Sequence, residues 1–276
     1  MAKCKVETCF ESELICHGGF CKRHDKCQHK LLDYSAGPVP RRVFPAPQGH
    51  LGVELEVCGY SSSAMGELIR AYRWCCADGS LADHGVELKL LTNTRSGPSR
   101  AACLSELAGR FARADRSCGL HVNLDMSGNW VSPTGECYPF YSGRATECWQ
   151  WLARNEDFFA SVTPPNRWGS SYVARVGGRD CAATDHYSWA NLSRRNRLEI
   201  RCHPSTTNPN KLRAWVGAMS DLCQLFRSAA SLPPDPWGAF RDPLAVSYLR
   251  ARMAGNGVLR TTAGLRLEEE AETCVA

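Results

Sequence analysis

The stretch CGLHVN, residues 118–123, decides the fold, because apolar and polar side chains alternate along it. The same alternation recurs in GVELEV at residues 52–57 and in LEIR at residues 198–201. Residues i and i+2 of a strand point to the same face of its sheet. The three stretches therefore predict three strands, each with an apolar face and a face that carries acidic, imidazole or guanidinium groups.

Two of these strands would each place a pair of charged side chains on one sheet face. Glu54 and Glu56 form one pair, Glu199 and Arg201 form the other, and His121 could meet them from the third strand. Carboxylates held this close repel one another unless a cation lies between them. The pattern predicts a divalent metal, and a metal beside an arginine predicts a bound phosphate group.

The remaining sequence predicts an α+β fold, with helices on one face of the sheet and polar groups on the other. Periodicity places strands near residues 51–58, 85–91, 118–124, 171–177 and 197–203. Apolar residues at helical spacing place helices near residues 104–111, 144–160, 212–226 and 241–254. Length allows one large domain with a small appendage, since the chain has 276 residues.

Net charge and cysteine content limit the classes of binding partner and the cellular compartment that we expect for the protein. The net charge of +5 suits an enzyme that handles anions but is too small to predict nucleic-acid binding by itself. No apolar run reaches the roughly eighteen residues of a membrane span. The N-terminus lacks an apolar export signal, so the 16 cysteines predict cytoplasmic thiols and metal ligands rather than disulfides.

Composition divides the chain into four segments. We expect a zinc-knuckle-like module at residues 1–34, a Pro-rich linker at 35–48, a catalytic domain at 49–262 and a flexible acidic tail at 263–276.

The N-terminal module is crowded with metal-binding side chains. A C-x2-H pair after two glycines lets two ligands face one ion from a tight turn. The preferred zinc ligands are Cys4, Cys9, Cys21 and His24. Competing ligands are Cys16, His17, Cys27 and His29, and the alternative to a zinc site is a disordered leader. Metal would supply stability that so short a segment cannot gain from apolar burial, and we assign the module a structural or docking role.

The order of several motifs resembles the amidoligase family of carboxylate–amine ligases, which are related to glutamine synthetase and to glutamate–cysteine ligase. The motifs are G-x-E-x-E, then DGSL at 78–81 with VEL at 86–88, then C-G-x-H-x-N, then E-x-R-x-H. They cover roughly residues 48 to 230 in family order, which is more specific than any one motif. The resemblance implies an ATP-dependent enzyme built on a glutamine-synthetase-like antiparallel sheet, and the compact, Arg- and Trp-rich chain with its short cysteine leader resembles phage-type members.

The resemblance also implies a role for each acidic residue. Glu54, His121 and Glu199 would hold one Mg²⁺ beside the nucleotide phosphates, and Glu56 and Glu87 would hold a second nearer the substrate carboxylate. Mg²⁺ is bound in this way by a few carboxylates together with phosphate oxygens and water.

The arginines and asparagines would act on the phosphate groups and the substrate. Arg201 would face the γ-phosphate and the acyl phosphate, and Arg167 would bind phosphate or the substrate carboxylate. Asn123 and Asn191 would donate hydrogen bonds to the ligands. The implied reaction transfers the γ-phosphoryl group of ATP to a carboxylate, and an amine then attacks the acyl phosphate.

Simpler interpretations exist for each part. Glu54 and Glu56 could lie on a solvated strand face, His121 could be a core histidine, and Glu199 with Arg201 could be an ion pair. The family order favours the metal site. The substrates would be an amino acid, a peptide or a cell-envelope component, and a homo-oligomer is compatible with the family. Alternatives are phosphate transfer without amide release, and a non-catalytic, zinc-bearing interaction protein on a ligase-derived scaffold.

Overall fold

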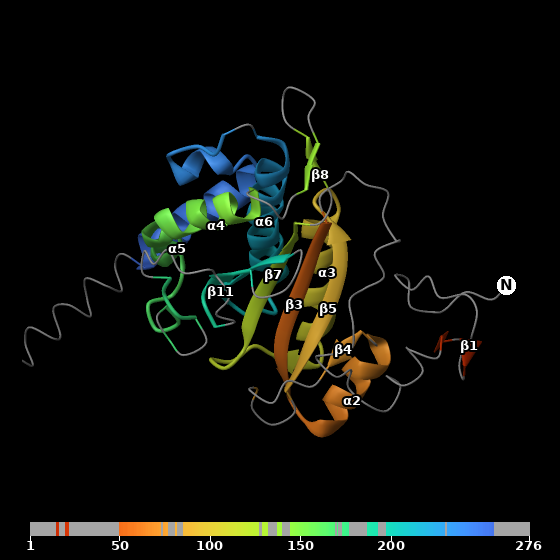
Figure 1. The fold of residues 1–276 in the computed structure, drawn as a ribbon. Helices are drawn as coiled ribbons and strands as arrows, with labels where there is room; N and C mark the ends of the chain where they lie inside the picture. The colour runs from red at the N-terminus through yellow and green to blue at the C-terminus, as the bar shows by residue number, and fades with distance from the viewer. Residues whose placement is uncertain are drawn as a thin grey trace, which may run out of the picture.

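The centre of the molecule is an antiparallel sheet with the strand order β10-β11-β7-β3-β5-β4, and β6 also pairs with β3 (Figure 1). The computed structural model describes residues 15–16, 20–21, 50–72, 74–76, 81, 85–126, 129–131, 137–139, 144–168, 170, 173–176, 187–192, 197–229 and 231–256. The long strands are β3 (His50–Gly59), β5 (Gly85–Asn93), β7 (Gly119–Asp125) and β11 (Arg197–Pro204). The short ones are β4 (Cys75–Cys76), β6 (Ala112–Arg113) and β10 (Ala190–Asn191).

Two further strand pairs lie outside the central sheet. They are β1 (Ile15–Cys16) with β2 (Phe20–Cys21), and β8 (Asn129–Val131) with β9 (Cys137–Pro139). The β1–β2 pair is all that the structure describes of the expected 1–34 module. The expected linker at 35–48 and tail at 263–276 lie outside the described residues.

In the part of the chain that the structure describes, the helices are α2 (Ser62–Ala71), α3 (Gly97–Gly109), α4 (Arg144–Arg154), α5 (Glu156–Val162), α6 (Pro209–Ser228), the short 3₁₀ helix η3 (Pro236–Ala239) and the last of them at 243–256. The start of α6 is set by Asn208, whose side chain accepts hydrogen bonds from the N–H groups of Asn210 and Lys211. Pro209 follows at the first helical position, where its missing N–H costs nothing. None of the helices described is both long and apolar enough to cross a bilayer.

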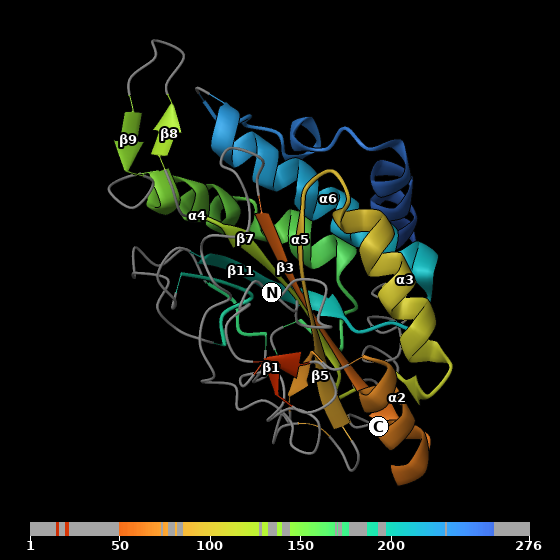
Figure 2. The same cartoon turned by 90° about the vertical axis from the view of Figure 1, so that its right-hand side faces the viewer.

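The apolar face of the sheet packs against α3 and α6, which lie side by side across it (Figure 2). Leu55 and Val122 of the sheet and Trp215 and Leu222 of α6 are almost completely buried. Close packing of such side chains supplies most of the favourable free energy of folding. The polar face opposite is thereby held as one rigid surface.

The predicted antiparallel sheet with helices on one face is confirmed, but two local predictions are wrong. Residues 144–160 form two helices, because the chain turns at Asn155, whose side-chain amide donates to the Trp151 carbonyl. A strand at 171–177 is not seen in its described part, where Ala174 makes one isolated bridge to Ser188. Two residues further on, the backbone N–H of Val176 donates to the Glu156 carboxylate instead of to a neighbouring strand. The bridge therefore does not extend into a strand.

A β-bulge lies in β11 between Ile200 and His203. After the bulge, His203 faces the helices. Its ring centroid lies 4.6 Å from that of Trp215, and its Nε2 is 2.7 Å from the hydroxyl of Tyr248. Burial lowers the pKa of His203 from 6.5 to about 3, so the folded protein holds a neutral imidazole.

This burial makes stability depend on pH. The unfolded imidazole takes up a proton near pH 6.5 and the folded one only near pH 3, so stability falls as the pH drops through that window. Lowering the pH from 7 to 5 should reduce the free energy of unfolding by about 2 kcal/mol more in the parent than in His203→Gln. Urea titrations at both pH values measure this difference, and parallel pH profiles would contradict it.

Candidate active site

The register of the sheet gathers acidic groups on its polar face. Glu54 in β3 lies between His121 of β7 and Lys89 of β5, and Glu56 lies opposite Glu87. Residues directly opposite each other in neighbouring strands share a face. Four strands that are distant in sequence therefore contribute to one cluster, because β11 adds its residues beside β7.

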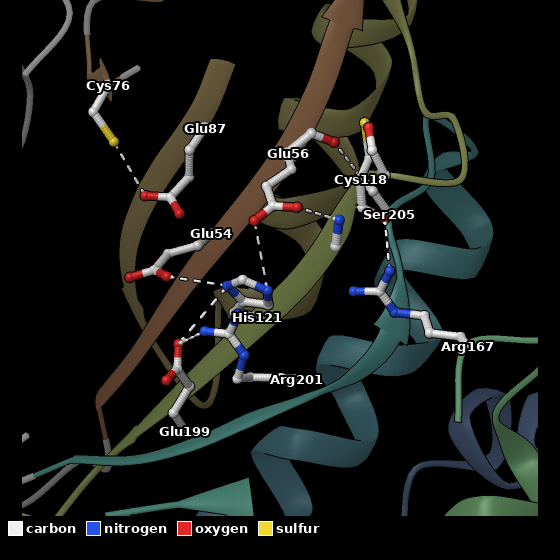
Figure 3. A network of polar contacts seen from close by, with 12 residues as sticks. Glu54, Glu56, Cys76, Glu87, Cys118, His121, Arg167, Glu199, Arg201 and Ser205 are labelled. Atoms are coloured by element: carbon white, nitrogen blue, oxygen red, sulfur yellow. Dashed lines mark hydrogen bonds and ion pairs between the residues drawn. The ribbon is translucent and has the colours of Figure 1, made fainter. Parts of the chain in front are cut away.

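The cluster is buried. Each of its main residues is at most 6% exposed: Glu54, Glu56, Glu87, His121, Glu199 and Arg201. Figure 3 shows these groups pointing toward one another from β3, β5, β7 and β11. Burial of this kind excludes a solvated strand face, since charged groups are rarely buried unless they are paired or bind a metal.

One group of possible metal ligands joins three strands. The Nδ1 atom of His121 lies 3.4 Å from Oε2 of Glu54 and 3.7 Å from Oε1 of Glu199. One ligand atom from each of the three residues lies within 4.8 Å of the others.

A second group shares the imidazole from its other side. The Nε2 atom of His121 lies 3.6 Å from Oε1 of Glu56. Glu56, Glu87 and His121 also offer ligand atoms that lie within 4.8 Å of one another. The two groups are thus adjacent, with His121 between them.

Several atoms in these groups lack hydrogen bonds. Oε2 of Glu54, Oε2 of Glu87 and Nδ1 of His121 are buried and make no hydrogen bond in the part of the chain that is described, although Glu54 and His121 lie at ion-pair distance from each other. Unsatisfied buried polar atoms are costly and therefore need an explanation. Carboxylate oxygens and imidazole nitrogens are common ligands of divalent cations, so the residues present fit a metal.

Burial and neighbouring charges shift the pKa values of the cluster. Burial would raise the pKa of Glu54, but contact with His121 and the imidazole charge outweigh it and lower the pKa to about 2. Burial, and then the charge of Glu54, raise the pKa of Glu87 to about 7. Burial lowers the pKa of His121, but Glu54 and Glu56 raise it above its usual value. A cation bound here would compete with a proton on His121, because a ligating imidazole is neutral.

The two predicted arginines reach the cluster from different directions. Arg201 places a terminal guanidinium nitrogen 3.4 Å from Oε1 of Glu199. Arg167 comes from the turn after α5 and donates to the Cys118 carbonyl over 3.2 Å. The Nε–H groups of both arginines are buried without a hydrogen-bond partner among the described residues, so each side chain keeps a donor for a ligand.

The two predicted asparagines differ in their contacts. Asn191 of β10 donates from Nδ2 to Oε2 of Glu199 over 3.0 Å and so orients a candidate metal ligand. The Nδ2 of Asn123 is buried with no hydrogen-bond partner in the described chain, which leaves it able to donate to a bound molecule.

Gly119 is the point of closest approach in the site. Its backbone N–H donates a short hydrogen bond to Oε2 of Glu56. A Cβ added at Gly119 would lie 2.4 Å from a guanidinium nitrogen of Arg167 and 2.7 Å from Nε2 of His121. Only glycine leaves room for these side chains to converge, which gives the glycine of the C-G-x-H-x-N motif a physical role.

Three polar side chains near the carboxylates were not predicted. Lys89 lies 3.0 Å from Glu87, and Cys76 donates a hydrogen bond to the same carboxylate. Ser205 donates to the carbonyl of Glu56. The alternation of β5 could have identified Lys89, because it lies two residues after Glu87. No sequence signal places Cys76 or Ser205 here.

The predicted zinc ligands Cys4, Cys9 and His24 lie outside the described residues, and only the backbone of Cys21 is described, within β2. The zinc site therefore stays a prediction.

No protein-family model and no curated protein matches the sequence. Among solved structures, the chain is similar to two structures of GmaS. One is described as a GmaS/ADP complex in conformation 1 and the other as apo GmaS without ligand. Each match has 14% identity and covers 80% of this chain and 70% of the other, with TM-scores of 0.44 and 0.39 respectively. Scores this low do not establish a common fold, so a function for this chain has to rest on the geometry of its own residues.

Proposed function

We propose that the chain is an ATP- and Mg²⁺-dependent carboxylate–amine ligase. The observation that carries the proposal is the buried cluster of four carboxylates around His121, with Arg201 and Arg167 at its margin. Glu54, His121 and Glu199 would hold one Mg²⁺; Glu56 and Glu87 would hold the other. The bound ions would neutralise phosphate charge and orient the triphosphate.

The charge of the cluster supports a polyphosphate ligand. Its four carboxylates face the cations of Lys89, Arg201 and Arg167, so two divalent ions would leave the site net positive. A site of that charge attracts a strongly anionic ligand, and a triphosphate meets both the metals and the arginines.

The positions of the protein groups suggest how an amide could form. Arg201, beside Glu199, would stabilise charge on the transferred phosphoryl group, and Arg167, beside Gly119, would hold the substrate carboxylate. The amine would then attack the acyl phosphate and displace phosphate. Burial would shield the acyl phosphate from water. The predicted N-terminal zinc module would direct the enzyme to a larger substrate.

Nucleotide binding should stabilise the protein only when metal is present. Mg²⁺ with ATP at about one hundred times the dissociation constant should add about 2.7 kcal/mol to stability, which raises the melting temperature by roughly 5–10 °C. Differential scanning fluorimetry with ATP alone, ATP with Mg²⁺, and ATP with Mg²⁺ and EDTA measures the effect. A melting temperature that is the same in all three would favour a non-catalytic scaffold.

The decisive assay measures ADP and phosphate release while amino acids and peptides are supplied in carboxylate–amine pairs. We expect release to require both members of a pair and mass spectrometry to find a product lighter by one water than their sum. A stable phosphorylated product without an amide would refute the ligase and indicate simple phosphate transfer.

A further inference from the structure

Two cysteines and an aspartate form a second cluster at the end of the sheet, next to the acidic one. Cys58 follows Glu56 by two residues in β3, and Cys118 directly precedes Gly119. Their sulfur atoms lie 3.6 Å apart, and Sγ of Cys118 lies 3.5 Å from Oδ1 of Asp115. One ligand atom from each of the three residues lies within 4.8 Å of the others.

These distances fit tetrahedral coordination. Two thiolates about 2.3 Å from a tetrahedral zinc ion lie about 3.8 Å apart, and a thiolate and a carboxylate oxygen lie about 3.5 Å apart. A disulfide would instead require the two sulfurs to approach to about 2.05 Å. The sulfur atoms therefore stand at the separation of two ligands of one ion.

The carboxylate is already oriented. The backbone N–H and the hydroxyl of Ser117 both donate to Oδ1 of Asp115, over 2.8 Å and 2.6 Å. The hydrogen bond from the Ser117 hydroxyl outweighs the opposing effect of burial and, with those from the Ser117 N–H and the two cysteines, lowers the pKa of Asp115 to about 2. Hydrogen bonds of this kind commonly fix metal-ligating carboxylates. Both cysteines are buried, whereas Asp115 is half-buried, which leaves a side from which water can complete the coordination.

We propose that Cys58, Asp115 and Cys118 bind a zinc-class divalent ion, distinct from the proposed Mg²⁺ sites. Two thiolates and one carboxylate suit Zn²⁺ and not Mg²⁺, which prefers oxygen ligands alone. Both thiols lose their protons to solvent when the ion binds, so affinity falls at low pH.

The ion would brace the neighbouring site. The carbonyl of Cys118 accepts hydrogen bonds from Arg167 and from the backbone N–H of Ser205, and the next N–H, that of Gly119, holds Glu56. An ion that ties Cys118 to β3 and to Asp115 fixes this backbone where Glu56 and Arg167 meet it. This consequence rests on the proposed function, but metal binding itself does not.

The test measures zinc in the full-length chain after loading with Zn²⁺ and dialysis. The parent should retain one more zinc ion per chain than Cys58→Ala or Cys118→Ala. Any zinc bound by the predicted N-terminal module should be the same in all three proteins. Cys223→Ala removes a buried thiol of α6 outside the cluster and should retain the parent's content. With Co²⁺ in place of zinc, thiolate charge-transfer absorption should fall in the first two variants only.

Asp115→Asn keeps both sulfurs and should bind zinc at least about tenfold more weakly, which tests the site even if the cysteine variants do not fold. Equal zinc content in parent and variants would overturn the proposal and leave two packed thiols. A Cys58–Cys118 disulfide found by peptide mapping of protein kept in reducing buffer would also overturn it, because the disulfide would consume both thiolate ligands. Failure of the ligase assay with the zinc difference intact would refute the proposed function alone.

Discussion

Glu54→Gln is expected to lower the rate of ADP release about 10²- to 10³-fold, the order of effect seen when a principal transition-state charge partner is removed. Glu54 is the central residue of β3, opposite both His121 and Lys89. The amide has the shape of the carboxylate but no charge, so it would weaken the proposed metal ligand without opening a cavity. The melting-temperature shift caused by Mg²⁺ with ATP should disappear as well.

Glu106→Gln is the matched control for this variant. Its side chain is 64% exposed on α3, and its ion-pair partner among the described residues is Arg110 in the neighbouring turn. We expect parent-like turnover and a parent-like response to Mg²⁺. Near-normal turnover in Glu54→Gln would show that the cluster is a structural ion network and not a metal site.

Gly119→Ala should abolish the proposed activity while leaving the protein folded. The added methyl group would meet Arg167 and His121 at distances that real Cβ atoms essentially never show, and a carboxylate oxygen of Glu56 at a tight 3.1 Å. One or more of these side chains must move, and a displacement of about 1 Å at a reacting centre can cost about 10²-fold in rate. We expect kcat to fall by at least that factor, measured in the same ADP-release assay.

Gly66→Ala is the control for the same chemical change. The nearest atom to its added Cβ is the flexible end of Arg70, at 3.7 Å. Alanine in the interior of α2 should stabilise the protein slightly, because glycine loses more backbone entropy in a helix. If Gly119→Ala were as active as Gly66→Ala, the close approach at Gly119 would have no catalytic importance.

The main sheet could be predicted because its strands carry a two-residue pattern over most of their length. In β3, Val53 and Leu55 face the helices while Glu54 and Glu56 face the site. The alternation of apolar and acidic residues in the sequence predicts these two faces. The same pattern gave the faces of β7 and predicted that their polar residues would share a surface. That prediction needed no knowledge of the strand order, because a sheet with one helix-covered face has only one other face.

Other features depend on contacts that no local pattern contains. The bridge at Ala174 does not continue because a carboxylate from α5 accepts the N–H of Val176, two residues further on. Cys76 reaches Glu87 only because two residues of β4 pair with β5. Such contacts are set by tertiary packing, and the sequence offers no spacing from which to infer them.

The bulge in β11 divides the E-x-R-x-H motif between two tasks. Strict alternation would put Glu199, Arg201 and His203 on one face, but the extra residue sends His203 to α6 and to Tyr248 of the last helix. The histidine therefore helps to hold the helices against the sheet. Of the three residues, Glu199 and Arg201 remain on the face that could contact a ligand. A relative that had lost the glutamate and the arginine but kept the histidine could still pack α6 and the helix at 243–256 against its sheet. The presence of that histidine in a relative would therefore indicate a shared fold and would not indicate catalytic activity.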